Sequence, residues 1–254
     1  MILTPAGQDV YYYARSIVDQ ADTLSKLHTD ASTPIQKNLR FAVAGILFPD
    51  ALITQSISAL TAQHITLDLK ETNTEDLFDR ISNGTSNTGL FLLDHHIEHS
   101  IRRSLELKEL ACHPVADAAI AVHFSPEDPL FHETTIDPQR LSGYRLVRTP
   151  PDYFGYLSWG HLIEQYSFPR FNQTLTISQY HTIVRFLRTP GNILIGHTLQ
   201  AQEFEKAGIQ TRPIRGSQGQ LTLSSVYHAN NQYTVPPEAK VLRAAVLNYY
   251  QQLP

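Results

Sequence analysis

Apolar residues follow one another along this chain at two spacings, one typical of strands and one typical of helices. Residues 65–71 alternate apolar and polar side chains, which predicts a strand with one buried face. Residues 49–63 place apolar side chains three and four positions apart, which predicts an amphipathic helix. The remaining predicted elements are strands at 39–45, 88–94, 144–149, 174–178, 192–197, 209–214 and 221–229, and helices at 73–84, 153–166, 180–189, 199–208 and 236–252.

These elements form two successive sets in which strands and helices alternate. The first set ends in residues 106–124, which supply strand material and include one run that is nearly all apolar. Such runs are typical of parallel strands buried between helices. A connection rich in Pro and Asp at 125–143 leads into the second set. The pattern therefore predicts an α/β fold in which the same alternation occurs twice.

The N-terminal segment predicts a separate amphipathic helix. Thr4 and Pro5 are typical cap and first-turn residues, and polar residues 28–37 follow the helix as a linker. The apolar positions alternate spacings of four and three, the seam that packs one helix against another. Either a partner helix or the chain's own domain could cover this stripe. The seam residues, which we interpret as a dimerisation helix, are Val10, Ala14, Ile17, Ala21 and Leu24.

Composition limits the class of protein. The formal net charge is −4, from 20 Lys and Arg against 24 Asp and Glu, whereas domains that bind nucleic acid usually carry a basic field. The single cysteine excludes an intramolecular disulfide, and the N-terminus lacks the apolar core of a signal peptide. No apolar run reaches the ~20 residues that a membrane-spanning helix needs. We therefore expect a cytoplasmic protein with no membrane partner, whose residues do not themselves bind DNA.

A ligand is expected at the ends of the predicted strands. In doubly wound α/β folds, ligands bind outside the carboxyl ends of the strands, where helix N-termini present free N–H groups that favour an anion. The same side chains could instead cap their own helices, because capping uses the same geometry. The candidates are Gly45, Ile46, Leu47, Glu71, Thr72 and Asn73 in the first set, and Thr149, Pro150, Ser178, Gln179, Tyr180, His181, Gly196, His197 and Thr198 in the second.

The helix predicted at 153–166 adds an aromatic surface to this picture. Tyr153, Phe154, Tyr156 and Trp159 would suit the aromatic or apolar body of a ligand if they face the site.

Chemistry other than binding has little support. Asp94, His95, His96 and His99 form the most metal-like cluster, but the chain has 12 His and no HExxH arrangement, so a polar loop after a strand is the favoured interpretation. There is no G-x-S-x-G elbow, P-loop or G-x-G-x-x-G motif, and Cys112 lies in apolar strand material, which predicts a buried structural cysteine. We expect no catalytic residue, no metal and no cofactor.

Several segments resemble LysR-type transcription regulators. Residues 3–7, Leu-Thr-Pro-Ala-Gly, and the helix after them resemble the junction where the winged helix-turn-helix of that family gives way to a linker helix. Residues 84–90 resemble the family's passage from a Gly into an apolar strand, with Asn87 where an Asp is usual. Residues 123–147 are similar to the passage into the family's second lobe, and 207–214 to the strand that leads back. The resemblance covers essentially the whole chain.

The resemblance implies a regulatory domain of two Rossmann-like lobes of the periplasmic-binding-protein type II kind, preceded by a long linker helix. It implies two crossovers between the lobes, which we place near 118–122 and 215–221. The expected division is 1–37 for the dimerisation helix and linker, 38–118 and 219–254 for lobe I, and 119–218 for lobe II. The DNA-binding domain of the family is expected to be missing from this sequence, so DNA would be bound only through it.

The resemblance further implies a homodimer or homotetramer that binds a small-molecule effector between the lobes and transmits the signal to the DNA-binding domain. The usual polar residue after the first strand is replaced by Ala44-Gly45-Ile46, which alters the expected effector contacts. Two alternatives remain. One is a cytoplasmic solute-binding module without regulatory output, and the other is a two-lobe enzyme that uses Asp94 and the nearby histidines. A cleft of helix N-termini and hydroxyls would favour the sensor, whereas converging ionisable groups or a metal would favour the enzyme.

Overall fold

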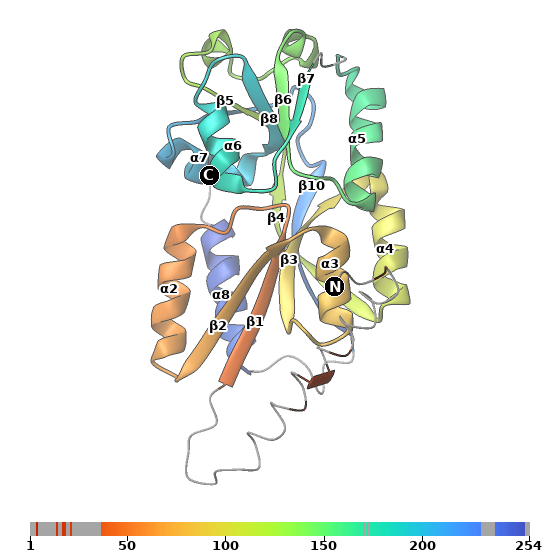
Figure 1. Ribbon diagram of the computed structural model, residues 1–254, viewed down its shortest axis with the longest axis vertical. Helices are drawn as coiled ribbons and strands as arrows, with labels where there is room; N and C mark the ends of the chain where they lie inside the picture. The colour runs from red at the N-terminus through yellow and green to blue at the C-terminus, as the bar shows by residue number, and fades with distance from the viewer. Residues whose placement is uncertain are drawn as a thin grey trace.

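The computed structural model describes residues 4, 14, 17, 18, 21, 37–169, 171, 173–229 and 237–251. Within these residues the chain forms two five-stranded sheets, which we call sheet A and sheet B, and helices cover both faces of each (Figure 1). The α/β fold class predicted from the two sets of alternating elements is therefore confirmed.

Sheet A is a mixed sheet that includes a strand from the far end of the sequence. In spatial order it contains β2 (Ile65–Thr72), β1 (Lys37–Ala44), β3 (Thr88–Asp94), β10 (Leu221–His228) and β4 (Leu110–Ala118). Strand β1 runs parallel to both β2 and β3, whereas β10 runs antiparallel to both β3 and β4.

Two pairs of helices bury the faces of sheet A. Helices α2 (Asp50–Thr61) and α8 (Pro237–Gln251) pack on one face, and α3 (Thr74–Ser82) and α4 (Glu98–Leu107) pack on the other (Figure 1). Helix α3 illustrates why these residues form a helix. Its apolar residues recur three and four positions apart, and all are buried between α3, α4 and sheet A: Leu77, Phe78 and Ile81.

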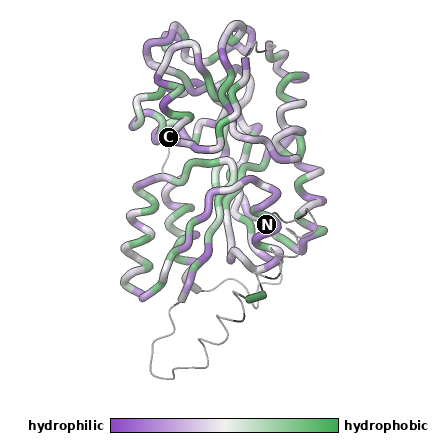
Figure 2. The backbone as a smooth tube through the Cα atoms, viewed as in Figure 1, coloured by the Kyte–Doolittle hydropathy of each residue, from purple (hydrophilic) through white to green (hydrophobic). Residues whose placement is uncertain are grey.

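Sheet B repeats the layered arrangement with shorter strands. In spatial order it contains β7 (Gln173–Thr176), β6 (Arg145–Arg148), β8 (Asn192–His197), β5 (Ile120–Phe124) and β9 (Gln210–Pro213). Its helices are α5 (Tyr153–Tyr166), α6 (Tyr180–Leu187) and α7 (Ala201–Lys206), and its 3-10 turns are η2 (Pro129–His132), η3 (Pro138–Leu141) and η4 (Thr198–Gln200). Hydrophobic stretches, green in Figure 2, follow the central strands of both sheets, where the buried side chains lie.

The chain passes between the sheets at two places, and hydrogen bonds hold both. The first passage is Ala119, between β4 and β5, whose backbone N–H and C=O both bond to Thr198 at the start of η4 (3.1 and 3.0 Å). The second comprises residues 214–220, between β9 and β10. There the fully buried Ser217 hydroxyl bonds to the carbonyl oxygen of Ile120 (3.0 Å), so the two passages are tied to each other.

The expectation of parallel strands at 110–124 is wrong. Strand β4 pairs antiparallel with β10, and β5 pairs antiparallel with both β8 and β9. Leu221, the first residue of β10, pairs with Asp94 at the end of β3, because the chain enters sheet A from the side of sheet B. A strand that enters at the carboxyl end of its neighbours must run against them, and an apolar run carries no information about that direction.

Two local interpretations also need correction. The histidine-rich stretch after β3 is not a polar loop, because it forms the 3-10 turn η1 (His95–Ile97) and then α4, which buries Ile101 and Leu105 against sheet A. Cys112 is half-buried rather than buried, because β4 is an edge strand of its sheet. The partial burial raises the pKa of its thiol.

Part of the proposed dimerisation helix lies outside the described residues. Val10 and Leu24 fall there, whereas Ala14, Ile17 and Ala21 are described as helical and exposed. The Ile17 side chain is 67% exposed, so it is not packed against either sheet. In the described residues, no helix is long and apolar enough to cross a membrane.

Candidate functional site

A cavity of about 600 Å³ lies between the two sheets, within the range typical of small-molecule sites. Turns after strands of both sheets line it, including Gly45 after β1, Asn73 after β2, Pro150 after β6 and Gln200 after β8. Strands β1, β2, β6 and β8 thus direct their carboxyl ends into a common space. This is the position where doubly wound folds bind ligands.

Most of the residues that the sequence singled out lie around this cavity. Gly45, Ile46, Glu71, Thr72, Asn73, Thr149, Pro150, Ser178, Tyr180, Gly196 and His197 line it. Leu47, Gln179, His181 and Thr198 do not belong to the lining. Thr198 instead holds the first passage between the sheets, and His181 is an exposed residue of α6. Asn73 caps α3 by accepting a hydrogen bond from the backbone N–H of Asp76 (2.8 Å).

The N-termini of α3 and α5 meet at the cavity and cap each other. The Asp152 carboxylate accepts a hydrogen bond from the backbone N–H of Gly155 in its own helix (2.8 Å) and one from the N–H of Glu75 in α3 (3.1 Å). In return, the Glu75 carboxylate accepts one from the N–H of Tyr153 (3.1 Å). We call this reciprocal pair of contacts the helix clasp. Carboxylates are favoured at helix N-termini. In the clasp, the protein's own carboxylates therefore occupy some of the free N–H groups at the starts of α3 and α5.

A second direct contact between the sheets is made by His197 at the end of β8. Its Nε2 lies 3.0 Å from the carbonyl oxygen of Gly45, whose φ of +73° turns the backbone after β1. The ring is 2% exposed, and burial lowers the pKa of His197 to about 4, while the bond to Gly45 opposes that shift. The imidazole is therefore neutral at pH 7, and because Nε2 donates, Nδ1 carries the lone pair.

Several buried polar atoms near the cavity have no hydrogen-bond partner among the described residues. Two of them belong to cavity-lining residues: Nε of Arg148 and Nδ1 of His197. A third, Nε2 of His123, lies behind Gly196, where an added Cβ would come within 2.6 Å of it. The hydroxyl of Tyr180 lies within reach of the Gln200 side chain and is not counted with them. Native proteins pair almost all buried polar groups. Unpaired atoms gathered at one cavity are therefore groups that a bound molecule could satisfy.

Part of the cavity lining is apolar. It includes Phe154, Trp159 and Leu162 of α5, together with Ile97 and Ile101. Helix α5 joins the two cores, because Phe154 packs with sheet A whereas Leu162 packs with sheet B. Tyr153 and Tyr156, which the sequence also suggested for this surface, are not in the lining and are 54% and 63% exposed.

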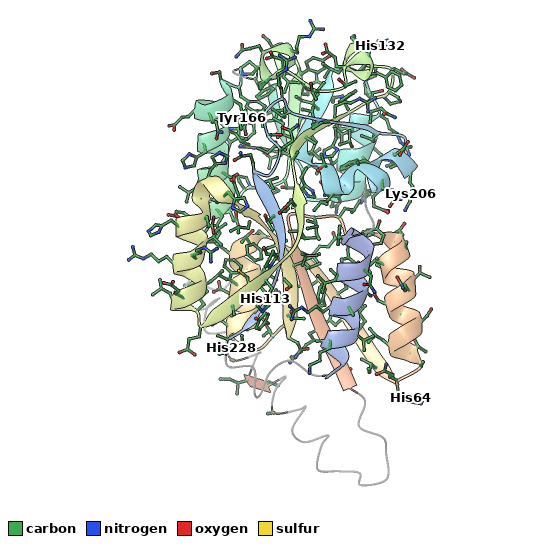
Figure 3. All side chains as sticks on the ribbon, turned by 180° about the vertical axis from the view of Figure 1, so that it is seen from behind. His64, His113, His132, Tyr166, Lys206 and His228 are labelled. Atoms are coloured by element: carbon green, nitrogen blue, oxygen red, sulfur yellow. The ribbon has the colours of Figure 1, made fainter. Side chains whose placement is uncertain are left out.

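Of the histidine cluster, only Asp94 lines the cavity. Its buried carboxylate accepts hydrogen bonds from the Ser158 hydroxyl and from both the backbone N–H (3.0 Å) and Nδ1 (2.9 Å) of His96. Within the described ranges, no three His, Cys, Asp or Glu side chains are grouped to hold a metal ion. Figure 3 shows other histidines well apart, with His132 towards one end of the molecule and His64 and His228 towards the other.

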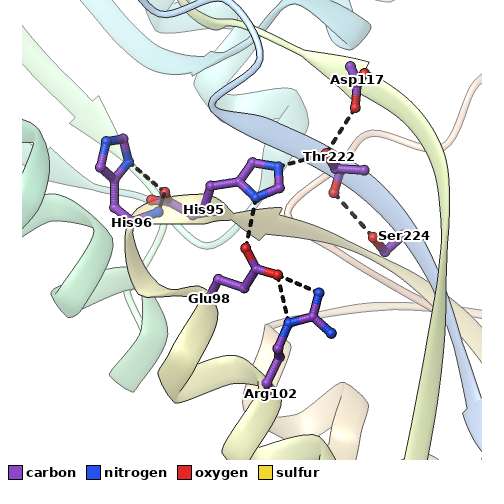
Figure 4. Close-up of polar contacts among 8 residues, drawn as sticks. His95, His96, Glu98, Arg102, Asp117, Thr222 and Ser224 are labelled. Carbon is purple, nitrogen blue, oxygen red and sulfur yellow. Dashed lines mark hydrogen bonds and ion pairs between the residues drawn. The ribbon is translucent and has the colours of Figure 1, made fainter.

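His95 does not belong to the cavity lining and joins a network of polar contacts that reaches β10 and β4 (Figure 4). Its Nδ1 contacts the Glu98 carboxylate (3.1 Å), and its Nε2 contacts the Thr222 hydroxyl of β10 (2.9 Å). Thr222 in turn donates to Asp117 of β4 (2.9 Å). The hydrogen bond from His95 is the largest of the contacts that lower the pKa of Glu98, and Arg102 adds to it. These contacts favour a structural role for His95.

Three features of the cavity escaped sequence reasoning. The sequence analysis selected turn residues, whereas Arg148 is the last residue of strand β6. Side-chain alternation along β6 places Arg148 on the same face as the buried Leu146, and this could have identified it. The helix clasp joins residues 77 and 78 positions apart, for which no local pattern exists. Gln200 lies in the 3-10 turn after β8, beyond the residues that directly follow the predicted strand.

Comparison with known proteins agrees with this architecture. A full-length variant of OxyR from Pseudomonas aeruginosa has 17% sequence identity and a TM-score of 0.60, over 96% of this chain and 81% of that one. The effector binding domain of QuiR in complex with shikimate has 13% identity and a TM-score of 0.60, over 85% of this chain and 98% of that one. HinK, a LysR family transcriptional regulator from Pseudomonas aeruginosa, has 11% identity and a TM-score of 0.60, over 98% and 83%. At these identities the likeness shows the fold.

No curated protein matches the chain. The family model described as the LysR substrate binding domain, however, matches residues 35–250, which include both sheets and the cavity between them. The chain therefore belongs to the LysR substrate-binding domain family.

Proposed function

We propose that this chain is the effector-sensing regulatory domain of a LysR-type transcription regulator, and that a small molecule binds in the cavity between the sheets. The observation that carries the proposal is the pair of unpaired buried polar atoms on Arg148 and His197 at a cavity of about 600 Å³. Family membership gives the regulatory context. The QuiR domain, which shares the fold, is described in complex with shikimate.

The signal would arise from a shift between conformations. A ligand that contacts both sheets favours the arrangement in which both sets of contacts can form, and it changes the equilibrium only by its difference in affinity. Residues 38–118 with 219–254 and residues 119–218 are the two lobes whose relative position would change. The N-terminal helix would carry that change to a partner subunit and to a DNA-binding domain.

The same proposal includes a homodimer or homotetramer joined through the N-terminal helix. Its support is the exposure of Ile17 and Val18, which are helical and 67% and 56% exposed. A partner helix would bury these side chains and so stabilise the assembly.

A thermal-shift screen against a metabolite panel tests the effector proposal. A ligand at 100 times its Kd stabilises by about 2.7 kcal/mol, which corresponds to roughly 5–10 °C for a chain of this size. Thr149→Trp, which places a large side chain in the cavity lining, should abolish the shift, whereas Thr189→Trp on an exposed position outside it should not. Turnover of a panel compound would favour the enzyme alternative, and a monomer that no compound stabilises would overturn the proposal.

A further inference from the structure

Arg148 is the cavity's one lining cation among the described residues, and no described residue pairs with its side chain. Arg145 in the same strand shows the ordinary situation, because its guanidinium donates to Gln173 (2.7 Å) and to Asn192 (2.9 Å). A guanidinium is always charged and carries five donors, so leaving a buried Nε unbonded is costly. An anion in the cavity would supply the acceptors that the protein does not.

The carboxylates that line the cavity do not compete for Arg148. Asp94 accepts hydrogen bonds from Ser158 and His96, and Asp152 belongs to the helix clasp. Glu71 is exposed at the end of β2. The clasp also occupies N–H groups of α3 and α5 that an anionic ligand could otherwise use. The geometry therefore concentrates the attraction for an anion at Arg148.

Arg148 and His197 present their side chains on the same face of neighbouring strands. Strands β6 and β8 are parallel, with Val147 opposite Leu194. The register continued by one residue places Arg148 opposite Ile195, and alternation returns His197 to that face. From strand spacing and rise, the two Cα atoms are roughly 8 Å apart, so one small ligand can contact both side chains.

The requirement at His197 is the opposite of that at Arg148. Because Nε2 donates to the Gly45 carbonyl and the ring is neutral at pH 7, the buried Nδ1 can only accept a hydrogen bond. A simple anion offers acceptors and would leave Nδ1 unpaired. A hydroxyl or an amine beside the anionic group would satisfy it.

We propose that the effector is a small carboxylate with a hydrogen-bond donor next to its charge, bound with its carboxylate on Arg148 and its donor on Nδ1 of His197. The inference rests on the proposed function, since it names the chemical class of ligand for the same cavity. The apolar part of the lining, which includes Phe154, Trp159 and Leu162, receives the hydrocarbon part of the molecule.

Two matched series of probes separate charge from donor. The first series is built on mandelate, which has both the carboxylate and the hydroxyl donor. Phenylacetate and 2-methoxy-2-phenylacetate keep the carboxylate and lack the donor, the former being smaller than mandelate and the latter larger. Mandelamide keeps the hydroxyl and lacks the charge. The second contains 2-hydroxybutanoate, butanoate and 2-hydroxybutanamide. Binding to the whole chain is measured by calorimetry and thermal shift. In at least one series, the hydroxy acid should bind about tenfold or more tightly than both the acid without a donor and the amide.

Arg148→Gln should remove the preference for the acid over the amide and weaken binding of the hydroxy acid by about 10- to 100-fold. Arg145→Gln is the matched control, because it removes the same charge from the same strand outside the cavity, and it should keep the preference. The far-UV spectrum and the unliganded melting temperature of both variants establish that each is folded.

Three results would overturn the inference: an amide that binds as tightly as its acid, a preference that survives Arg148→Gln, or no binding by any member of either series. Its failure can be told from failure of the proposed function. A compound of another class that stabilises the protein and is blocked by Thr149→Trp would overturn the chemical class and leave the sensor proposal standing. Absence of any stabilising compound would overturn both.

Discussion

The ring of His197 donates from Nε2 to the carbonyl oxygen of Gly45 across 3.0 Å, so the last residue of a strand in sheet B is bonded to the first turn of sheet A. The contact lies at the cavity, and the ring is almost fully buried. Protonation would keep the Nε2 donor but would turn Nδ1 from an acceptor into a donor, so the polarity of the cavity depends on the protonation state of this ring.

This arrangement predicts a loss of stability in mild acid. The pKa of His197 is about 4 in the folded chain against an ordinary value of 6.5, so between these limits the unfolded state binds a proton that the folded state does not. The free energy of unfolding should fall as pH falls through this window, by about 3 kcal/mol from this group. Urea denaturation at pH 7.5 and 4.5 measures it.

His197→Gln should lose a smaller amount of stability between these two pH values than the unaltered chain. The lowered pKa of buried His123 contributes in the same direction and remains in the variant. His181→Gln, on an exposed residue of α6, is the control and should keep the full dependence. Equal pH dependence in both variants would contradict the assignment to His197.

Gly196→Ala should destabilise the protein by about 1–3 kcal/mol, as overpacking against a buried side chain does. The new Cβ would meet Nε2 of His123 at 2.6 Å and Oε1 of Gln200 at 3.1 Å. His123 cannot easily yield, because it stacks on Phe204 with 4.1 Å between ring centroids and bonds to Thr211.

Gly160→Ala is the control for that change. A Cβ at Gly160, inside α5, meets nothing within 4 Å, so this variant should be more stable by about 0.5–1 kcal/mol. Thermal and urea unfolding of both variants measure the difference. A Gly196→Ala protein as stable as Gly160→Ala would show that the pocket behind Gly196 is not rigid.

The helix clasp predicts energetic coupling between Glu75 and Asp152. Asp152→Ala should cost about 1 kcal/mol, because it removes the cap of α5 as well as the contact with α3. In a double-mutant cycle with Glu75→Ala, the two changes should be non-additive by about 0.5 kcal/mol or more. The same cycle with Glu164→Ala, on an exposed residue near the other end of α5, should be additive. Additive energies for both pairs would exclude the clasp as a stabilising element.

His95→Ala should lower the free energy of unfolding by about 1–2 kcal/mol, because it removes contacts with Glu98 and Thr222 near the passages between the sheets. His99→Ala removes an exposed ring of α4 and should change stability by less than about 0.5 kcal/mol. Urea denaturation at pH 7 compares them. If the two variants are equally stable, the network in Figure 4 has no net stabilising effect.

Sequence reasoning succeeded where neighbouring residues decide the outcome. The spacing of apolar residues determined the strands and most helices, and Asn73 caps α3 as its residue type suggests. The turns around Gly45, Thr72 and Gly196 could be assigned to one site from the sequence, because parallel strands in an α/β sheet direct their carboxyl ends to the same edge.

The terminal helix marks the limit of that reasoning. Val241, Ala245 and Leu247 are apolar residues on one side of the helix, whereas the buried residues are Ala239, Leu242, Val246 and Tyr250. Apolar residues occupy more than one side of α8, so only the surface offered by α2 and β4 determines which side is buried.

The amino-acid sequence by itself determined the alternating elements, the caps and the turns that end the strands, because each depends on residues a few positions apart. The tertiary structure alone decided the antiparallel direction of β10, the bond between His197 and Gly45, and the unpaired state of Arg148. These depend on which distant segments meet, 152 residues apart for His197 and Gly45. Such contacts are set by the packing of whole sheets, which no local pattern records.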